Sequence, residues 1–212
     1  MTKTKATIRI RLADALDAEA IADIYAPSVA ASATSFEAEP PSPEEMRQRI
    51  EETTATYPWL VCECDGVVAG YAYATRHRLR AAYQWCVETS VYVHPDFRHG
   101  GIARGLYTSL FAILAAQGFV NAYAGITLPN ARSVALHEKL GFLPLAVYRG
   151  IGFKAGEWHD VGWWHLIVSK HRPAPQPPKP LSELRREPDW DALLSTGVSL
   201  IHTDGCARRT SN

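Results

Sequence analysis

The spacing of apolar and polar residues along the chain predicts an ordered series of strands and helices. Residues 7–12 alternate apolar and polar side chains, which is the pattern of a half-buried strand. Residues 17–31 instead place Ile21, Ile24 and Tyr25 at the spacing of one helical face. By the same criteria, further strands are expected at 59–64, 67–76, 84–93, 120–126, 148–153 and 163–168, and further helices from residue 42, at 101–117 and at 131–140.

Residues with special backbone preferences mark the ends of several of these elements. Ser42 is a helix N-cap followed by Pro43 and two acidic residues, and Gly141 is placed to end the helix at 131–140. Asp65-Gly66 between two strand patterns predicts a two-residue hairpin turn. Hairpins mixed with helical crossovers predict an α+β fold, in which a central mixed sheet is flanked by helices.

The composition changes after residue 170. Five prolines between residues 173 and 180 cannot continue a helix or the middle of a sheet. We therefore expect residues 1–170 to form one domain. Residues 171–212 are expected to form a Pro-rich, extended or disordered tail, with room for a short helix near Trp190–Leu194.

Bulk composition narrows the class of protein. The chain of 212 residues is 47% hydrophobic, as expected of a soluble globular domain. Its formal net charge is +0, so bulk electrostatics favour neither nucleic acid nor a membrane surface as a partner. No apolar run approaches the ~20 residues of a transmembrane helix, and the first residues lack the apolar core of a secretory signal. These features predict a cytoplasmic protein.

The four cysteines do not form a metal-binding pattern. Cys62 and Cys64 point to the same face of a predicted strand, where a disulfide between them would be strained, and Cys86 and Cys206 lack partner spacing. No Cys-x-x-Cys pair occurs, and His137-Glu138 is not followed by the second histidine of a zinc-protease helix. We expect no bound metal, and buried free thiols.

A glycine-rich loop joins the strand that ends near residue 93 to the helix that begins near residue 101. Gly100 and Gly105 have the outer spacing of a P-loop, but Leu106 stands where that motif needs lysine. A dinucleotide-binding fingerprint is also excluded, because Ile102 and Arg104 occupy positions that need glycine. A loop at a helix N-terminus offers backbone N–H groups and a positive dipole to a pyrophosphate. The residues of the glycine-rich loop that are expected to bind it are Arg98, His99, Gly100, Gly101, Ile102, Ala103 and Arg104.

The Arg98-x-x-Gly101-x-Ala103 pattern resembles the coenzyme A loop of the GNAT acyltransferase superfamily. Blocks between residues 7 and 168 resemble, more closely, the phosphinothricin N-acetyltransferase family, which also acetylates methionine sulfoximine. The resemblance implies the GNAT fold, acetyl-CoA as the donor, a small amino acid as the acceptor, and a homodimer. The blocks are Tyr57-Pro-Trp-Leu-Val, Val87-Glu-Thr-Ser-Val-Tyr-Val, Gln117-Gly-Phe, Leu128-Pro-Asn, Leu136-His-Glu and Gly156-Glu-Trp-His-Asp-Val-Gly.

Two side chains are candidates for catalysis. A protonated α-amine must lose a proton before it attacks a thioester, and Glu88 is the leading candidate for the general base. The resemblance places its strand beside the donor; without that placement, Glu88 would be an exposed strand-end carboxylate. His137 shares a helical face with Asn130 and Ser133. The residues alone leave His137 as an acid for the leaving thiolate, a second base, or a buried structural histidine, and the resemblance favours catalysis.

The resemblance also assigns contacts to both substrates. For acetyl-CoA these are the glycine loop, Asn130, Ser133 and the backbone of Val91, Tyr92 and Val93. The strand expected at 84–93 must separate from its neighbour at these residues to admit the cofactor. One of their backbone N–H groups can then bind the oxyanion of the tetrahedral intermediate. Two guanidinium groups suit the carboxylate and phosphinate of the acceptor, although residues 76–80 alone would be taken for a solvated loop. The acceptor-binding residues are Phe36, Arg78, Arg80, Tyr83, Tyr92 and Tyr107.

Two positions depart from the family's pattern. Arg78 stands where some relatives have lysine, and Ala103 stands at a loop position where glycine also occurs in the family. The predicted reaction is direct acetyl transfer in a ternary complex, since no cysteine is placed to carry the acyl group. Two alternatives stay open. One is an acetyltransferase that acts on another small amine or on a protein N-terminus. Two arginines in the acceptor pocket argue against a cationic acceptor. The other is a non-catalytic acyl-CoA-binding module, which the presence of Glu88 and His137 opposes.

Overall fold

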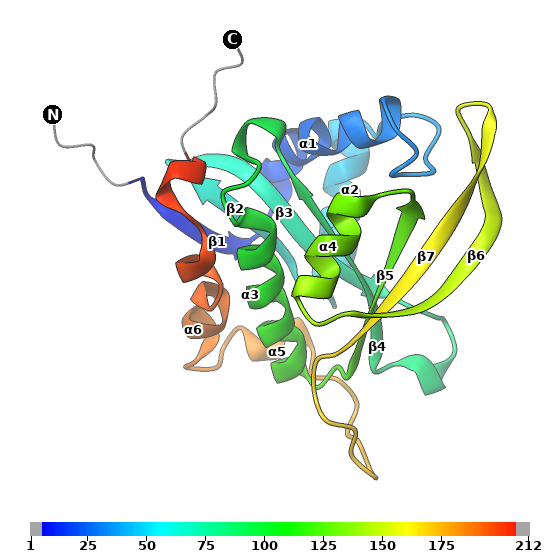
Figure 1. Ribbon diagram of the computed structural model, residues 1–212. Helices are drawn as coiled ribbons and strands as arrows, with labels where there is room; N and C mark the ends of the chain where they lie inside the picture. The colour runs from blue at the N-terminus through cyan, green and yellow to red at the C-terminus, as the bar shows by residue number, and fades with distance from the viewer. Residues whose placement is uncertain (1–5, 207–212) are drawn as a thin grey trace, which may run out of the picture.

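The computed structural model describes residues 6–206 and is built around one sheet with helices on both faces (Figure 1). The sheet has seven strands in the order β1-β2-β3-β4-β5-β7-β6. The β4–β5 pair is parallel, and the other neighbouring pairs are antiparallel. The predicted mixed α+β sheet is confirmed. The strands are β1 (Ile8–Leu12), β2 (Trp59–Cys64), β3 (Val67–Arg76), β4 (Cys86–Val93), β5 (Asn121–Leu128), β6 (Leu143–Lys154) and β7 (Glu157–Ile167).

Two hydrophobic clusters, one on each face of the sheet, hold the helices in place. Leu60 and Val61 are neighbours on β2 but are buried in different clusters, because successive side chains of a strand point to opposite faces. Leu60 packs in the cluster under α3, and Val61 packs in the cluster under α1 and α2. The four long helices are α1 (Ala18–Ala30), α2 (Pro43–Thr54), α3 (Ile102–Gln117) and α4 (Ala131–Lys139).

The local signals in the sequence end elements where they were predicted to. The Ser42 side chain accepts a hydrogen bond from the Glu45 N–H, and Glu45 bonds back to the Ser42 N–H, which forms a capping box at the start of α2. Asp65 and Gly66 have φ values of 50° and 79° and turn β2 into β3. Gly141 follows α4 with φ 92°, a left-handed conformation that glycine adopts without a Cβ clash.

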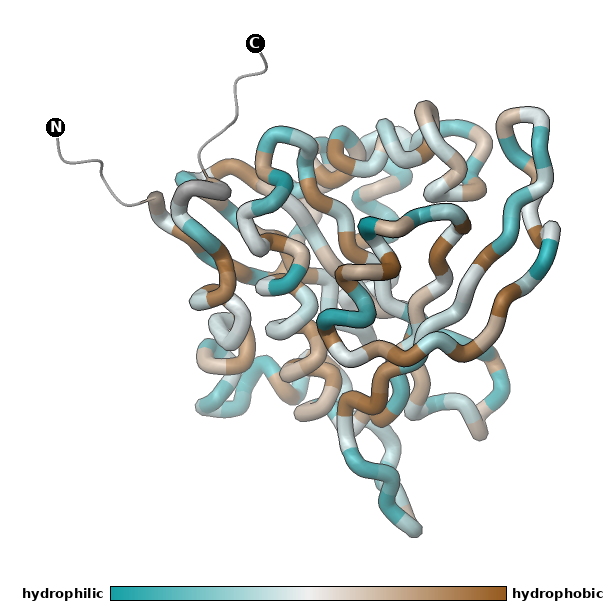
Figure 2. Tube along the Cα trace, viewed as in Figure 1, coloured by the Kyte–Doolittle hydropathy of each residue, from teal (hydrophilic) through white to brown (hydrophobic). Residues whose placement is uncertain are grey.

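The final hairpin is longer than predicted. The sequence pattern placed its strands at 148–153 and 163–168, whereas β6 begins at Leu143 and β7 begins at Glu157. Ala155 and Gly156, with φ values of 53° and 85°, form the turn between them. β6 is an edge strand exposed along most of its length, so it has no alternation between a buried and an exposed face to reveal it. Hydrophobic residues continue along this projecting hairpin (Figure 2).

The C-terminal segment corrects the prediction of an extended or disordered tail. Through Cys206 it forms short helices that lie against α3, on the side away from α4 (Figure 1). They are α5 (Leu181–Leu184), α6 (Trp190–Ser195), which confirms the short helix expected there, and 3₁₀ turns at Val198–Leu200 and Thr203–Cys206. Leu181, Leu184 and Ile201 are buried in the same cluster as α3. Residues 207–212 of the predicted tail lie outside the described residues.

Small residues on α3 let this segment approach closely. The Ser109 hydroxyl donates to the Leu194 carbonyl (2.7 Å) and accepts from the Gly197 N–H (3.0 Å). A Cβ at Gly105, one turn away, would lie 2.6 Å from the Ile201 side chain and 2.8 Å from the Gly197 carbonyl oxygen. Prolines stop a regular helix, but they do not prevent a chain from packing, and the prediction neglected the apolar residues beyond them.

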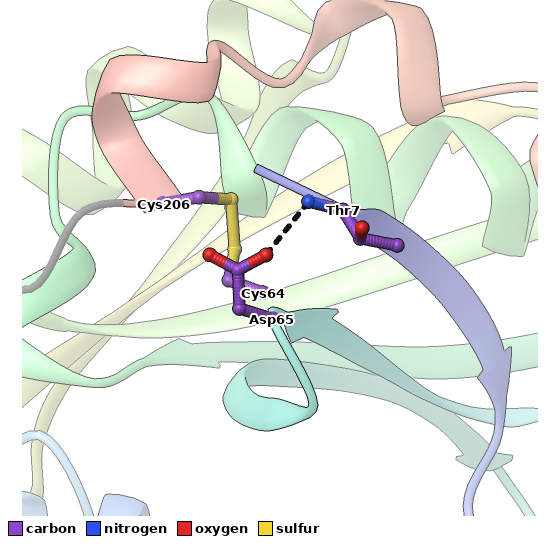
Figure 3. The surroundings of a disulfide bond; sticks show 4 residues. All are labelled: Thr7, Cys64, Asp65 and Cys206. Carbon is purple, nitrogen blue, oxygen red and sulfur yellow. Dashed lines mark hydrogen bonds between the residues drawn. A yellow bond between two sulfur atoms is a disulfide. The ribbon is translucent and has the colours of Figure 1, made fainter. Parts of the chain in front are cut away.

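A disulfide joins the end of this segment to the sheet. Cys206 is bonded to Cys64 at the end of β2, with 5.2 Å between the two Cα atoms (Figure 3). The expectation of free thiols is therefore wrong for these two residues, while Cys62 and Cys86 are free. Beside the disulfide, the Asp65 carboxylate accepts a hydrogen bond from the Thr7 N–H (Figure 3). The two cysteines are 142 residues apart, so no local spacing could reveal the pair.

We expect Cys206→Ser to lower the free energy of unfolding, because the disulfide closes a long loop and restricts the unfolded chain. The expected loss is about 2–4 kcal/mol, measured by urea denaturation under oxidising conditions. Reduction of the wild-type protein should cause a similar loss, and reduction of the variant should cause none. Cys86→Ser, which changes a free thiol, is the matched control. Equal stability of oxidised and reduced wild type would contradict the pairing.

Candidate active site

The site is formed where β4 and β5 separate. The parallel pairing of these strands runs from Cys86–Asn121 to Glu88–Tyr123 and ends there, while β4 stays paired with β3 as far as Val93. Backbone groups of β4 that would otherwise bond to β5 are thus available to a ligand. The hollow between the strands is lined by Thr34, Thr89, Ser90, Val91, Tyr92, Tyr107, Gly125, Ile126, Thr127, Asn130, Ser133 and His137.

The glycine loop presents donors at the start of α3. His99 and Gly101 have φ values of 70° and 80°, and α3 begins at Ile102. Within the part of the chain that the structure describes, no acceptor is hydrogen-bonded to the backbone N–H groups of residues 99–104. Arg98 and Arg104 are exposed beside them. Unpaired N–H groups, the helix dipole and two guanidinium groups together favour an anion such as a pyrophosphate.

The C-terminal segment supports this loop from behind. The His202 N–H donates to the Gly100 carbonyl (2.9 Å), so this carbonyl is already paired. A Cβ at Gly101 would collide with the Leu200 backbone, which shows how closely the two segments approach. Sequence analysis missed this contact, because it depends on where the segment after residue 180 folds.

Glu88 faces the α1–α2 side of the separated strands. Its neighbours Val87 and Thr89 are buried toward α3, so by strand alternation Glu88 points to the other face. One carboxylate oxygen lies 2.9 Å from Nδ1 of His77, which follows β3 directly. The His77 ring stacks on Tyr123 of β5 with a centroid distance of 4.4 Å. His77 was not among the predicted site residues. Thr75 is the β3 partner of Glu88, and the position of His77 two residues after Thr75 is the one feature that could have pointed to it.

His137 lies on the opposite face, on α4, and is only 4% exposed. Its Nδ1 is 2.7 Å from the Ser133 carbonyl oxygen, which can only accept, so Nδ1 carries the hydrogen. Nε2 is then free to accept from the Tyr107 hydroxyl at 3.2 Å. Burial lowers the pKa of His137 and raises the pKa of Tyr107. The ring is therefore neutral and the hydroxyl keeps its proton.

Asn130 and Ser133 lie together at the start of α4. The Asn130 side chain accepts from the Ser133 N–H at 3.1 Å and so acts as the helix N-cap. Both residues also line the hollow. The capping contact fixes one oxygen of the amide, and its NH₂ group is left for a ligand.

Two aromatic residues of the predicted acceptor pocket have different surroundings. Tyr92 lines the hollow and stacks on Tyr71 at 5.2 Å, and burial raises its pKa. Phe36 is half exposed, and its ring covers Gly152 of β6 so closely that a Cβ there would overlap it. The Lys154 ammonium holds the loop around Phe36, since it donates to the carbonyls of Val29, Ser35 and Glu37.

Phe36 does not line the hollow, and neither do the remaining predicted acceptor residues. Arg78 and Arg80 lie in the exposed loop between β3 and β4, and neither guanidinium is paired with another residue in the range 6–206. Tyr83 is half exposed, with its ring edge-on to His77 at a centroid distance of 6.5 Å. The structure thus brings Tyr92, Tyr107, Asn130, Ser133 and His137 together around the hollow, and the two arginines are not among its lining residues.

Among the described residues, no group of three or more histidine, cysteine, aspartate or glutamate side chains could hold a metal ion. No helix within residues 6–206 is long and apolar enough to cross a membrane.

This fold, with a separated strand pair and an anion-binding loop at a helix N-terminus, defines an acyl-CoA acetyltransferase. Residues 10–163 match the model of the acetyltransferase (GNAT) domain, and the chain belongs to this family. It is an N-acetyltransferase that uses acetyl-CoA.

The chain is similar to proteins of the phosphinothricin branch. It is 40% identical over 184 residues to the phosphinothricin N-acetyltransferase of Streptomyces viridochromogenes, covering 87% of this chain and 100% of the relative. It is 34% identical over 163 residues to the L-methionine sulfoximine/L-methionine sulfone acetyltransferase of Salmonella typhimurium, covering 76% of this chain and 95% of the relative. A phosphinothricin acetyltransferase from Sinorhizobium meliloti, solved with acetyl-CoA, matches with a TM-score of 0.74 and 34% identity, over 84% of this chain and 99% of that chain.

The lowered pKa of His137 predicts a pH dependence of stability. Its pKa lies below the ordinary 6.5, so the unfolded chain binds this proton more readily than the folded protein. The contribution of His137 is complete above pH 6.5 and is lost as the pH falls toward the folded-state pKa. Between about pH 7 and about pH 5.5, the free energy of unfolding should fall less steeply in His137→Gln than in wild type.

Urea denaturation across this range measures the two slopes. His165, whose pKa is also lowered by burial, contributes equally to both proteins. His202→Gln alters an exposed ring and should keep the wild-type slope. Identical slopes for wild type and His137→Gln would show that burial does not lower the pKa of His137 in the folded state.

Proposed function

We propose that the enzyme acetylates the free α-amine of a small amino acid such as phosphinothricin or methionine sulfoximine, directly from acetyl-CoA in a ternary complex. The observation that carries the proposal is the position of the chemical groups. Glu88 reaches the separation of β4 and β5 from one face of the sheet, and His137 with Tyr107 reaches it from the other. Two substrates can therefore meet between the strands without an acyl-enzyme.

The donor is assigned to the α3–α4 face. The N–H groups of residues 99–104 bind the pyrophosphate, and the NH₂ group of Asn130 contacts the pantetheine arm. The arm then takes the place that a fully paired β5 would occupy beside β4. A backbone N–H of Val91–Val93 stabilises the oxyanion, since it is a fixed donor that costs no reorganisation during the reaction.

Glu88 is assigned as the general base. It removes a proton from the ammonium group, directly or through one water, and the amine nitrogen then attacks the thioester carbonyl carbon. The C–S bond breaks as the amide forms. The nitrogen loses two protons in all and the sulfur gains one, so one proton is released. The Tyr107 hydroxyl has one hydrogen, which it donates to Nε2 of the neutral His137 before the reaction. The hydroxyl turns this hydrogen toward the departing thiolate and stabilises it.

The acceptor is assigned to the α1–α2 face, where Glu88 and Tyr92 point. Arg78 and Arg80 lie just after His77, which contacts Glu88, and have no carboxylate partner of their own in the described residues. Guanidinium groups bind oxyanions in a bidentate manner. They can close on the carboxylate and on the second polar group of the acceptor, while Phe36 and Tyr83 cover its apolar part.

We also propose that the enzyme is a cytoplasmic homodimer. The β6–β7 hairpin exposes large apolar side chains, among them Leu145, Phe153 and Trp158, and such a surface favours a partner. Leu145→Glu should then give a monomer in analytical ultracentrifugation, and Leu16→Glu, at another exposed leucine, should not. A monomeric wild type would refute the dimer.

The cytoplasm is inferred from the intracellular donor. There the Cys64–Cys206 bond would persist only if packing protects it from cellular reductants.

Glu88→Gln should lower kcat about 100-fold or more, because the amide cannot take the proton. The measurement is thiol release from acetyl-CoA at saturating phosphinothricin or methionine sulfoximine. Binding of acetyl-CoA, followed by calorimetry, should stay within about twofold of wild type. Glu183→Gln, on the exposed surface of α5, is the control. A wild-type kcat in Glu88→Gln would remove the base assignment.

Arg78→Ala and Arg80→Ala should each raise the KM for the acceptor about 10-fold or more, as expected for the loss of a charge-assisted hydrogen bond. The KM for acetyl-CoA should not change. Arg76→Ala removes an exposed arginine of the same run, whose side chain contacts Tyr57 instead, and should behave as wild type. A preference for spermidine or peptide amines over the two amino acids would overturn the proposed acceptor.

A further inference from the structure

His77 is the one protein group hydrogen-bonded to the Glu88 carboxylate among the described residues. Its Nδ1 lies 2.9 Å from one carboxylate oxygen of Glu88. The carboxylate can only accept, so the hydrogen between the two atoms belongs to Nδ1. The other carboxylate oxygen has no protein partner in residues 6–206 and is left for the amine or a water.

The His77 ring is held by packing rather than by a second hydrogen bond. It stacks on Tyr123 at 4.4 Å with an interplanar angle of 19°, and Trp163 meets it edge-on at 6.1 Å. The side chain of His77 is 13% exposed, whereas that of Glu88 is 38% exposed. A fixed ring therefore anchors a carboxylate that would otherwise be free to rotate.

We propose that His77 is a positioning residue that holds Glu88 in the orientation from which it accepts the proton of the acceptor amine. This inference rests on the proposed role of Glu88 as base. A base oriented by a third group is a common arrangement in nucleophilic enzymes. The register supports it: Glu88 is paired with Thr75 and with Tyr123, and His77 lies two residues beyond Thr75, so it points to the same face.

Two substitutions separate the hydrogen bond from the packing. His77→Phe keeps a ring to stack on Tyr123 but has no donor. His77→Asn loses the ring, and its amide nitrogen takes the position of Nδ1. We expect kcat to fall about 10- to 100-fold in His77→Phe and to stay within about threefold of wild type in His77→Asn. The KM for both substrates should change little in either variant.

A double-mutant cycle with Glu88→Gln completes the test. If His77 acts through Glu88, His77→Phe should not slow the Glu88→Gln enzyme any further. An equal loss in both backgrounds, a wild-type kcat in His77→Phe, or no rescue by His77→Asn would overturn the inference while leaving Glu88 as the base. A wild-type rate in Glu88→Gln alone would instead refute the proposed base, and the inference with it.

A second, independent observation concerns the C-terminal segment. Its last described turn packs on the start of α3: the His202 N–H bonds to the Gly100 carbonyl, and Ile201 fills the space beside Gly105. Its first part packs at the other end of the helix, where the Lys179 N–H donates to the Gln117 carbonyl. The disulfide at Cys206 anchors the segment beyond the loop.

We also propose that residues 197–202 hold the glycine loop in the conformation that binds the donor. Because the carbonyl of Gly100 is paired with His202, the N–H groups of the loop stay oriented outward, and less order has to be gained on binding. The disulfide keeps this contact from opening. The inference rests on the proposed pyrophosphate role of the loop.

Ile201→Ala tests this role, and Leu184→Ala is its matched control. Both side chains are buried in the C-terminal segment, but Leu184 packs near the far end of α3. We expect Ile201→Ala to weaken acetyl-CoA binding about fivefold or more. Leu184→Ala should lower the stability of the protein by a similar amount but leave acetyl-CoA binding unchanged. Equal affinities in the two variants would overturn the proposal. Failure of Arg98→Ala to weaken binding would instead count against the loop itself.

Discussion

The separation of β4 from β5 is the constraint on which the rest of the site depends. A parallel pair that continued beyond Glu88–Tyr123 would saturate its backbone groups and fill the space between the two faces of the sheet. Because the pairing stops, α4 can bring His137 to a position beside Tyr107, and β4 offers unpaired N–H groups. The sheet stays intact on the other side of β4, where β3 pairs with it as far as Val93. The strand is thus held firmly on one edge and open on the other.

This opening also divides the chemistry between two faces. The α3–α4 face is buried, and its histidine is neutral because burial disfavours the charged ring. The opposite face is more open, and the Glu88 carboxylate is partly exposed there. The direct transfer proposed above is compatible with this arrangement, since groups from both faces meet where the strands separate.

Much of the fold could be predicted from local patterns. The capping box at Ser42, the turn at Asp65-Gly66 and the glycine loop each depend on a few neighbouring residues, and each is present as expected. Features that depend on distant pairing could not be predicted. The Cys64–Cys206 bond and the contact of Gly197 with Ser109 join segments far apart in the chain. Gly105 and Ser109 on one face of α3 were the available signal, because small residues on a helix mark a close approach. His77 was overlooked for a similar reason, since its partner lies on another strand.

Hydrogen exchange of backbone amides, measured with and without acetyl-CoA, tests the central claim most directly. The account predicts that the donor slows exchange at residues 99–104 and at those N–H groups of residues 89–93 that do not face β3, because these unpaired groups become bonded or shielded. Exchange along β6 should be unaffected by the donor. Unchanged exchange at both the loop and β4, with protection appearing elsewhere, would contradict the assignment of the strand separation as the acetyl-CoA site.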